Sequence, residues 1–330
     1  MRKILFLVIL CSFFLAKSQS ENGLLNETNK YAFYGHYWIN LHHFLYNEAL
    51  VNVSTDSTLI PTEVKDKLGE YEKKRLNNVI QFYKDSVIGK DLPTDPYLNE
   101  FEKWLIQESQ LSLTGIPSKF RVISFQLVQV SLIYRTYFWE EHLENITNTL
   151  NENLINIQTT ENEMFDRLSN AFKREWKDGK IRVDICYLGN LSPLNSMEKT
   201  YITKDPFRII IGSQPIYQPQ GNWVETLYLN SLMNVKELNK SQVNEYLLEQ
   251  TQDLELSYSI LWVEFQYFIT GYITKQLLET AGIENYETFL TRNEIEAGHN
   301  KVLNKYIPKY LKNKKSYEWC IEKVVKKLSK

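Results

Sequence analysis

The sequence predicts a mainly helical α+β protein with a helical first half, then a small β unit and further helices. Three patterns lead to this fold class. Residues 118–157 contain neither Gly nor Pro and keep apolar residues at helical spacing. From Ile181 the apolar residues alternate with period two, as in a β-strand. From Leu254 to Thr280 helical spacing returns, in the most apolar segment of the second half.

The first 18 residues are predicted to be a secretory signal peptide. Arg2 and Lys3 precede an apolar run, Ile4–Leu15, and small residues follow it. The run is shorter than the roughly 20 residues that a bilayer-spanning helix needs. We therefore expect a mature chain that begins near Gln19, has no membrane span and is secreted or periplasmic.

The composition excludes one class of partner. Loss of the signal peptide removes three positive charges, which moves the formal net charge from -2 to -5. A mildly acidic chain gives no reason to expect nucleic acid as a partner. Its 43% hydrophobic residues can bury one large core or two smaller ones.

Two cysteines, Cys186 and Cys320, remain after export. An oxidising compartment permits a disulfide between them, and two buried free thiols are the alternative. Two isolated cysteines cannot form a zinc–thiolate site by themselves. The sequence leaves the choice between bridge and free thiols open.

The first half is expected to be flexible over residues 19–30 and helical beyond them. Predicted helices cover residues 31–50, 61–87, 95–110, 117–157 and 160–176. Asp95 before a proline is a typical N-cap, and Thr160 with Glu163 matches a capping box. We divide the chain into a signal peptide (1–18), a helical half (19–178) and a second half (179–330), the two halves packing as one compact unit.

Polar residues embedded in apolar patterns are the candidate pocket residues of the first half. His42 and His43 lie in an aromatic segment, and Arg135 and His142 follow the buried part of the next long helix. Because buried polar groups seek partners, we expect them to line one interior region together with the helix that begins at Trp223. Packing and hydrogen bonding of the rings is the alternative.

The second half is expected to begin with two half-buried strands, residues 181–188 and 207–213, paired antiparallel. Helices are predicted at residues 223–235, after Ser241, and from Leu254 to a stop at Gly282. Within them, Glu225 and Glu264 are further candidate pocket residues, and an Arg or Tyr partner for Glu264 is the alternative to a catalytic role. The last 30 residues carry ten Lys, which predicts a basic C-terminal helix with a solvated face.

Several segments together resemble a family of uncharacterised secreted bacterial proteins with a zinc-peptidase-like core of the His-Glu-x-x-His type. The segments are NLHHFLY (40–46), YRTYFWEEHLEN (134–145), IRVDICY (181–187), RIIIGS (208–213), WVETLY (223–228) and LWVEFQYFITGY (261–272). They occur in the family's order across most of the mature chain. The resemblance implies a zincin-like pair of core helices after the β unit.

The resemblance also implies that the metal site is lost. The family's metal positions fall on Leu229, Met233 and Tyr272, and its general-base position on Asn230. Leu has no lone pair, the Met thioether suits zinc poorly, and Asn cannot take a proton from water near neutral pH. The chain therefore looks like a degenerate member that needs no metal or other cofactor.

We predict a secreted, non-catalytic relative of a zinc peptidase that binds an extracellular peptide, protein or other ligand in a residual cleft. One alternative is a hydrolase with an unrecognised site built from histidines, including His36, and buried carboxylates. Another alternative is a structural, envelope-associated protein whose aromatic residues only fill the core.

Overall fold

The computed structural model describes residues 23–55, 57–90, 92, 95–108, 111, 115–189, 208–215, 223–252, 254, 257–282 and 297–329. The predicted signal peptide lies outside them. In chain order the main elements are β1 (Leu24–Glu27), β2 (Tyr31–Tyr34), α2 (Tyr37–Thr55), α3 (Thr62–Lys67), α4 (Glu70–Ser86), α5 (Pro96–Leu105), α6 (Arg121–Tyr134), α7 (Glu140–Phe172), β3 (Ile181–Gly189), β4 (Arg208–Pro215), α9 (Trp223–Ser231), α10 (Gln242–Thr251), α11 (Tyr258–Thr280), α12 (Ala297–Leu311) and α13 (Tyr317–Leu328).

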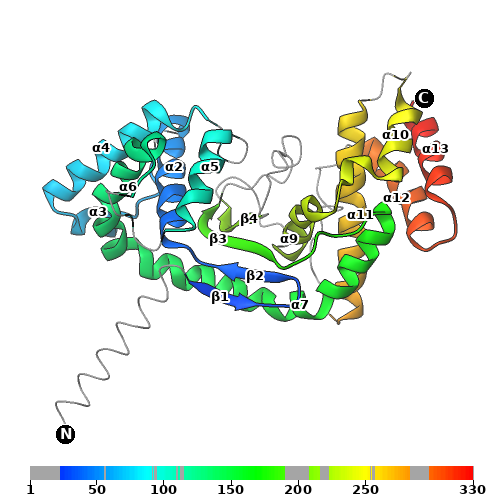
Figure 1. Ribbon diagram of the computed structural model, residues 1–330, viewed down its shortest axis with the longest axis horizontal. Coiled ribbons are helices and arrows are strands. Elements are labelled where there is room, and N and C mark those ends of the chain that lie inside the picture. The colour runs from blue at the N-terminus through cyan, green and yellow to red at the C-terminus, as the bar shows by residue number, and fades with distance from the viewer. Residues whose placement is uncertain are drawn as a thin grey trace, which may run out of the picture.

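The predicted class, a mainly helical α+β fold, is confirmed by these elements. The sheet lies in the middle of the molecule, with a lobe of helices α2–α6 on one side and a lobe of helices α9–α13 on the other (Figure 1). Helix α7 runs along the sheet from one lobe to the other (Figure 1). A short 3₁₀ turn, Ser118–Phe120, precedes α6, and a π-helical segment, Arg135–Trp139, joins α6 to α7.

The sheet has the strand order β1-β2-β3-β4. Strands β1 and β2 form an antiparallel hairpin, whereas β2, β3 and β4 are mutually parallel. The antiparallel pairing predicted for β3 and β4 is therefore wrong. Residues 190–207 separate these strands, a connection long enough for the crossover that parallel strands require.

The first strands occupy a segment for which we predicted other structure. Residues 24–27 are a strand instead of a flexible start, and residues 31–34 are a strand instead of the first turn of a helix. The carboxylate of Glu161 on α7 holds the hairpin turn, because it accepts hydrogen bonds from the Thr28 hydroxyl and the Asn29 amide at 2.6 and 2.9 Å. The helix predicted for residues 31–50 begins at Tyr37.

Both faces of the sheet are buried, against two hydrophobic clusters. Residues such as Val183 and Ile211 face the first cluster, which includes α7, α9 and α11–α13. Cys186 belongs to the second cluster, which includes α2 and α4–α6. Since Asp184 and Cys186 are as buried as their neighbours, the prediction of a half-buried strand is wrong for β3. Parallel strands between two layers are commonly buried on both faces.

Two helix boundaries in the first half differ from the prediction. The helix predicted from Pro61 to Val87 is interrupted at Gly69, whose amide bonds to the Glu72 carboxylate at the start of α4. No helix begins at Thr160, because α7 continues through it, and the Thr160 hydroxyl bonds to Tyr228 at 2.6 Å. A Thr with an acidic residue three positions later also fits a helix interior, where apolar spacing continues on one face.

The second half follows the predicted helices more closely. The Ser241 side chain caps α10, and α11 ends before Gly282, which has a φ of 77°. The predicted helix at residues 223–235 is an α-helix only to Ser231 and continues as a 3₁₀ turn, Leu232–Asn234. The predicted basic terminal helix is a pair, α12 and α13, packed against each other.

Cys186 and Cys320 are both buried and free. They belong to different hydrophobic clusters, so the structure places free thiols where the sequence left a disulfide open. Among the helices in the described part of the chain, none has the length and apolarity to cross a bilayer.

Candidate functional site

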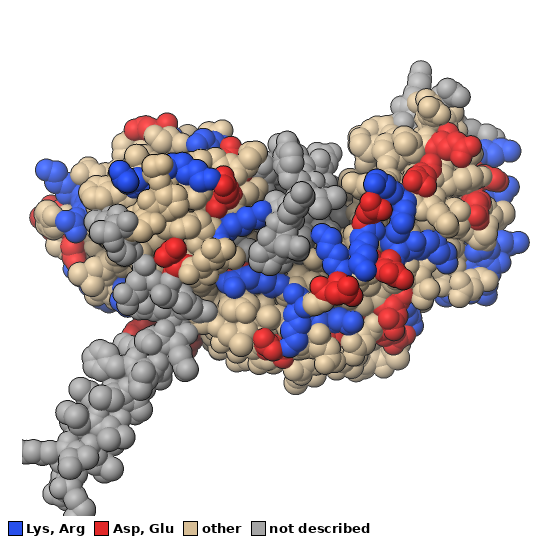
Figure 2. Space-filling view, viewed as in Figure 1, with Lys and Arg blue, Asp and Glu red and all other residues tan. Residues whose placement is uncertain are grey.

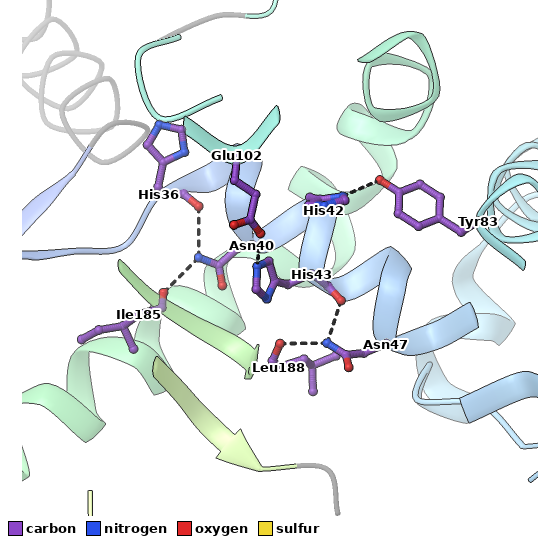
Figure 3. A network of polar contacts seen from close by, with 9 residues as sticks. All are labelled: His36, Asn40, His42, His43, Asn47, Tyr83, Glu102, Ile185 and Leu188. Carbon is purple, nitrogen blue, oxygen red and sulfur yellow. Dashed lines mark hydrogen bonds and ion pairs between the residues drawn. The ribbon is translucent and has the colours of Figure 1, made fainter. Parts of the chain in front are cut away.

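Helix α2 extends the edge of the sheet where β2 stops. Strand β2 pairs with β3 only as far as Asp184. Beyond that point the side-chain amide of Asn40 bonds to β3 in place of a neighbouring strand. It donates to the Ile185 carbonyl at 3.1 Å and accepts from the Tyr187 backbone N–H at 2.8 Å. About two turns later, Asn47 donates to the Leu188 carbonyl at 3.0 Å (Figure 3). An Asn side chain carries the same donor and acceptor as a peptide group, so it can replace a strand neighbour.

This anchoring places His43 opposite Cys186. His43 lies within one turn of both Asn40 and Asn47 on α2, and it therefore shares the face that contacts β3. Cys186 lies between the β3 residues that these two Asn side chains bind. The His43 Nε2 atom bonds to the Glu102 carboxylate of α5 at 2.7 Å (Figure 3). Cys186, Glu102 and His43 are 0, 1 and 3% exposed, so all three groups are shielded from water.

The electrostatics of this cluster favour a charged imidazole. Burial by itself lowers the pKa of His43, but interaction with the Cys186 and Glu102 side chains raises it to about 10. The His43 Nδ1 atom has no hydrogen-bond partner among the described residues. A buried cation is stable only beside compensating groups, and Glu102 supplies the negative charge. We name Cys186, His43 and Glu102 the thiol cluster.

Two further histidines, His42 on α2 and His142 at the start of α7, are held differently. The His42 Nδ1 atom bonds to the Tyr83 hydroxyl at 2.8 Å, and its ring contacts Phe101 edge-on. His142 stacks on Tyr187 at a centroid distance of 3.8 Å and pairs with the Tyr134 hydroxyl. Burial lowers the pKa of His142 to about 3, so this ring is neutral at physiological pH.

The candidate pocket residues do not form one site. His42 and His43 lie on the helix that packs in the second cluster, whereas Trp223 packs with the first cluster against Phe33. His142 contacts both sides, because it stacks on Tyr187, which packs against the first cluster, and also meets Phe138 of the second. The predicted shared region is therefore not formed by His42 and His43, which the sheet separates from Trp223. Arg135 is exposed, with its guanidinium 4.9 Å from the centre of the Tyr37 ring.

The two candidate carboxylates of the second half are in separate places. Glu225 lies fully buried in the first turn of α9, where the helix dipole favours a negative charge. Glu264 of α11 bonds to His299 of α12 at 2.6 Å, a histidine partner that the sequence analysis did not name. His299 is far from Glu264 in the sequence, so no local pattern predicts that the two residues form a pair.

The residues at the family's metal positions lie on packed helices. Leu229 is fully buried, Asn230 donates to the Thr226 carbonyl, and α9 packs against α11, which carries Tyr272. Met233 lies in the 3₁₀ turn after α9, and its side chain is outside the described residues. Leu229 and Met233 are thus not one turn apart on a single α-helix, as a zinc-binding pair requires. Within the described ranges, no three His, Cys, Asp or Glu residues are placed to share a metal ion.

A surface cleft of about 330 Å³ lies where the ends of α7 and α12 meet α11. Its polar lining consists of two cations and three amides, and its apolar lining contains two aliphatic residues, an alanine and a tyrosine. The lining residues are Arg167, Asn170, Ala171, Lys173, Ile273, Gln276, Tyr310, Leu311 and Asn313. No carboxylate is among them. Gln276 also donates to the Tyr272 hydroxyl at 3.1 Å, which connects the cleft to the third of the family's metal positions.

No family model, curated protein or solved structure matches this chain.

Sequence reasoning missed the residues that complete these sites. The sequence analysis predicts Cys186 only as one end of a disulfide or as a buried free thiol, and it does not name Glu102 among the candidate residues. The sequence does not link either residue to His43, because it does not show that α2 packs against β3. The cleft is formed by helix ends that are distant in sequence, and no motif marks it.

Proposed function

We propose that this protein is an exported, non-catalytic relative of zinc peptidases that binds an extracellular peptide in the cleft between α7, α11 and α12. The loss of catalysis rests on side-chain chemistry, because Leu229 cannot bind a metal and Asn230 cannot act as a general base. The cleft is the observation that carries the binding role. Its volume lies at the lower end of the range of roughly 300–1,000 Å³ that is typical of small-ligand sites.

The lining favours a peptide with a carboxylate next to an apolar side chain. Arg167 is held in position by Glu163 at 2.5 Å and by the Gln276 carbonyl at 3.1 Å. Its guanidinium is therefore oriented before a ligand arrives, which reduces the entropy cost of binding. Lys173 adds a second cation, while Ile273 and Tyr310 offer an apolar surface for a neighbouring side chain.

The surroundings of the cleft add to the positive potential. Residues 173–180, which connect α7 to β3, contain four cations and two acids. On the face shown in Figure 2, Lys and Arg gather in the middle of the molecule and toward the lobe of α9–α13. Such a potential raises the local concentration of an acidic ligand although the net charge of the chain is negative.

The binding role is tested with the acetylated dipeptide of leucine and glutamate, titrated into the full chain and followed by NMR shifts. We expect a dissociation constant of roughly 0.1–1 mM, weakened at least about threefold by Arg167→Gln. Glu163→Gln removes the negative charge that competes with the ligand for Arg167, while the Gln oxygen can still accept from the guanidinium and orient it, so this variant should strengthen binding. Arg75→Gln, at an arginine held by Tyr71 on α4, is the matched control and should change nothing. Binding that ignores both Arg167 and Glu163 would contradict the proposed site.

The loss of catalysis is tested separately. Metal analysis of the purified chain should find far less than one zinc per molecule, and peptide hydrolysis should be absent with or without added zinc. Stoichiometric zinc would overturn the non-catalytic part of the proposal. If neither zinc nor the dipeptide binds, a structural role in the envelope is the remaining interpretation.

A further inference from the structure

The helical pair α12 and α13 carries a basic surface that the proposed peptide cleft does not use. Helix α12 contains no acidic residue, and exposed lysines repeat along it at intervals of four and three residues. They are Lys301, Lys305, Lys309 and Lys312. The Lys312 amide bonds to the Pro308 carbonyl, so the helical spacing continues to this residue. The four lysines therefore lie on one side of the helix, in a row roughly 16 Å long.

Aromatic rings lie between these lysines. The ammonium group of Lys309 is 5.8 Å from the centre of the Tyr306 ring and 5.7 Å from that of Trp319. Lys315, in the turn between α12 and α13, is 5.5 Å from the same Trp319 ring. Trp319 is half-buried, so part of its side chain reaches the surface. We name the row of four lysines, Lys315 and Trp319 the basic face.

The two acidic residues of α13 are placed away from this row. The Glu322 carboxylate accepts a hydrogen bond from the Tyr246 hydroxyl of α10 at 3.0 Å. Glu318 lies in the first turn of α13, where the helix dipole favours its charge. Within the described ranges, no ion pair joins a lysine of the basic face to a carboxylate. Figure 2 shows Lys and Arg at the outer edge of the molecule, where α13 lies in Figure 1.

The spacing of the row requires a ligand with many negative charges. Lys301 and Lys305, and Lys305 and Lys309, are four residues apart, and like charges at this spacing destabilise a helix. A single carboxylate or phosphate group cannot contact a row of this length. A surface that carries negative charges along the whole row removes the repulsion and gains attraction from each lysine.

We propose that the basic face binds the anionic surface of a phospholipid membrane, with α12 lying along the headgroups. Lysine attracts a charged surface as a point charge, and α12 and α13 contain no arginine for bidentate recognition of single phosphates. Tryptophan beside lysine is typical of side chains that lie at a membrane–water boundary. The export that the sequence predicts brings the chain next to envelope lipids.

This binding is peripheral and electrostatic. The mature chain has a formal charge of -5, so an anionic membrane repels most of the molecule, and the basic face determines its orientation. Each lysine close to such a surface strengthens binding about fivefold. The attraction acts over a Debye length of about 10 Å at 0.1 M salt, so distant lysines contribute little.

The test sediments the full mature chain with vesicles, made either of phosphatidylglycerol and phosphatidylcholine or of phosphatidylcholine alone, at 0.1 M salt. We expect binding to the first kind only and release at 0.5 M salt. The double variant Lys305→Gln and Lys309→Gln should bind roughly 25-fold more weakly. The matched control, Lys67→Gln and Lys74→Gln, removes two exposed lysines of the lobe of α2–α6 and should bind like the unaltered chain.

Three outcomes would overturn the proposal. If the basic face is only solvated, the anionic vesicles will not bind the chain. Equal binding by the two double variants would show that the position of the lysines is unimportant. Binding to soluble heparin or to an oligonucleotide, without binding to vesicles, would indicate a soluble polyanion instead of a membrane. The Lys305 and Lys309 variant should bind the dipeptide normally in the cleft, so this proposal and the proposed function can fail independently.

Discussion

At the scale of single residues, the environment determines what each buried histidine does. Burial lowers the pKa of His43, but interaction with Cys186 and with the Glu102 carboxylate at 2.7 Å raises it to about 10. His142 pairs with the Tyr134 hydroxyl among aromatic rings, and burial lowers its pKa to about 3. The two rings therefore carry different charges at neutral pH although both are buried. The sequence identified both as embedded polar residues, but it could not distinguish them.

The low pKa of His142 predicts an acid-dependent loss of stability. Between about pH 3 and 6.5 the unfolded chain binds a proton that the folded ring does not, so this contribution is complete above pH 6.5 and decreases as the pH falls. The slope is up to about 1.4 kcal/mol per pH unit. In urea unfolding, His142→Gln should be less stable at pH 7.5, and its deficit should shrink toward pH 5. If the unfolding free energies of the unaltered chain and of His142→Gln decreased equally with falling pH, this account would be contradicted.

The residues that the sequence could not place are those with long-range partners. Glu102 lies on the helix predicted for residues 95–110, where no pattern marks it as buried, yet it is 1% exposed and bonds to His43. His299 was left out of the site, and it meets Glu264 across α11 and α12. Local patterns set which residues share a helix face, but they do not state which other helix lies opposite.

At the scale of elements, Asn side chains of α2 make the hydrogen bonds to β3 that the peptide groups of a neighbouring strand would otherwise make. The sequence predicted a helix and a strand here, since apolar spacing determines both. It did not predict that they adjoin, because Asn40 and Asn47 are not a recognisable motif until the register of the contact is known. The same limit explains the missed strand β2, a four-residue segment that leads directly into α2.

The Asn40 amide should contribute strongly to stability. Asn40→Ala removes the partner of the Ile185 carbonyl and of the Tyr187 amide inside a site where Asn40 is 2% exposed. We expect a loss of about 2–5 kcal/mol in the free energy of unfolding. Asn145→Ala, at a half-buried Asn that donates to the Glu141 carbonyl of its own helix, should change it by less than about 0.5 kcal/mol. Chemical denaturation compares the two, and similar losses would show that the bridge to β3 is unimportant.

At the scale of the whole molecule, the sheet joins two hydrophobic clusters that do not follow the boundary drawn at residue 178. The first cluster combines Tyr31 and Phe33 with Ile181 and Val183, from both sides of that boundary. Helix α7 belongs to the predicted helical half, yet its buried residues from Ile146 onward pack in the cluster of the second half. A composition shift marks where the secondary structure changes, and it carries no information on which segments share a core.

This shared core predicts that the two lobes unfold together. Phe33 is fully buried and contacts the rings of Tyr31 and Trp223, so Phe33→Ala should cost about 3–5 kcal/mol. Because the sheet contacts both clusters, the urea midpoint of amide protection should fall equally in α4 and in α13, which lie in different lobes. Val53→Ala, at a side chain that is 61% exposed, is the control and should leave the urea midpoints of both helices unchanged. A fall confined to α13 would mean that the lobe of α2–α6 folds as a separate unit.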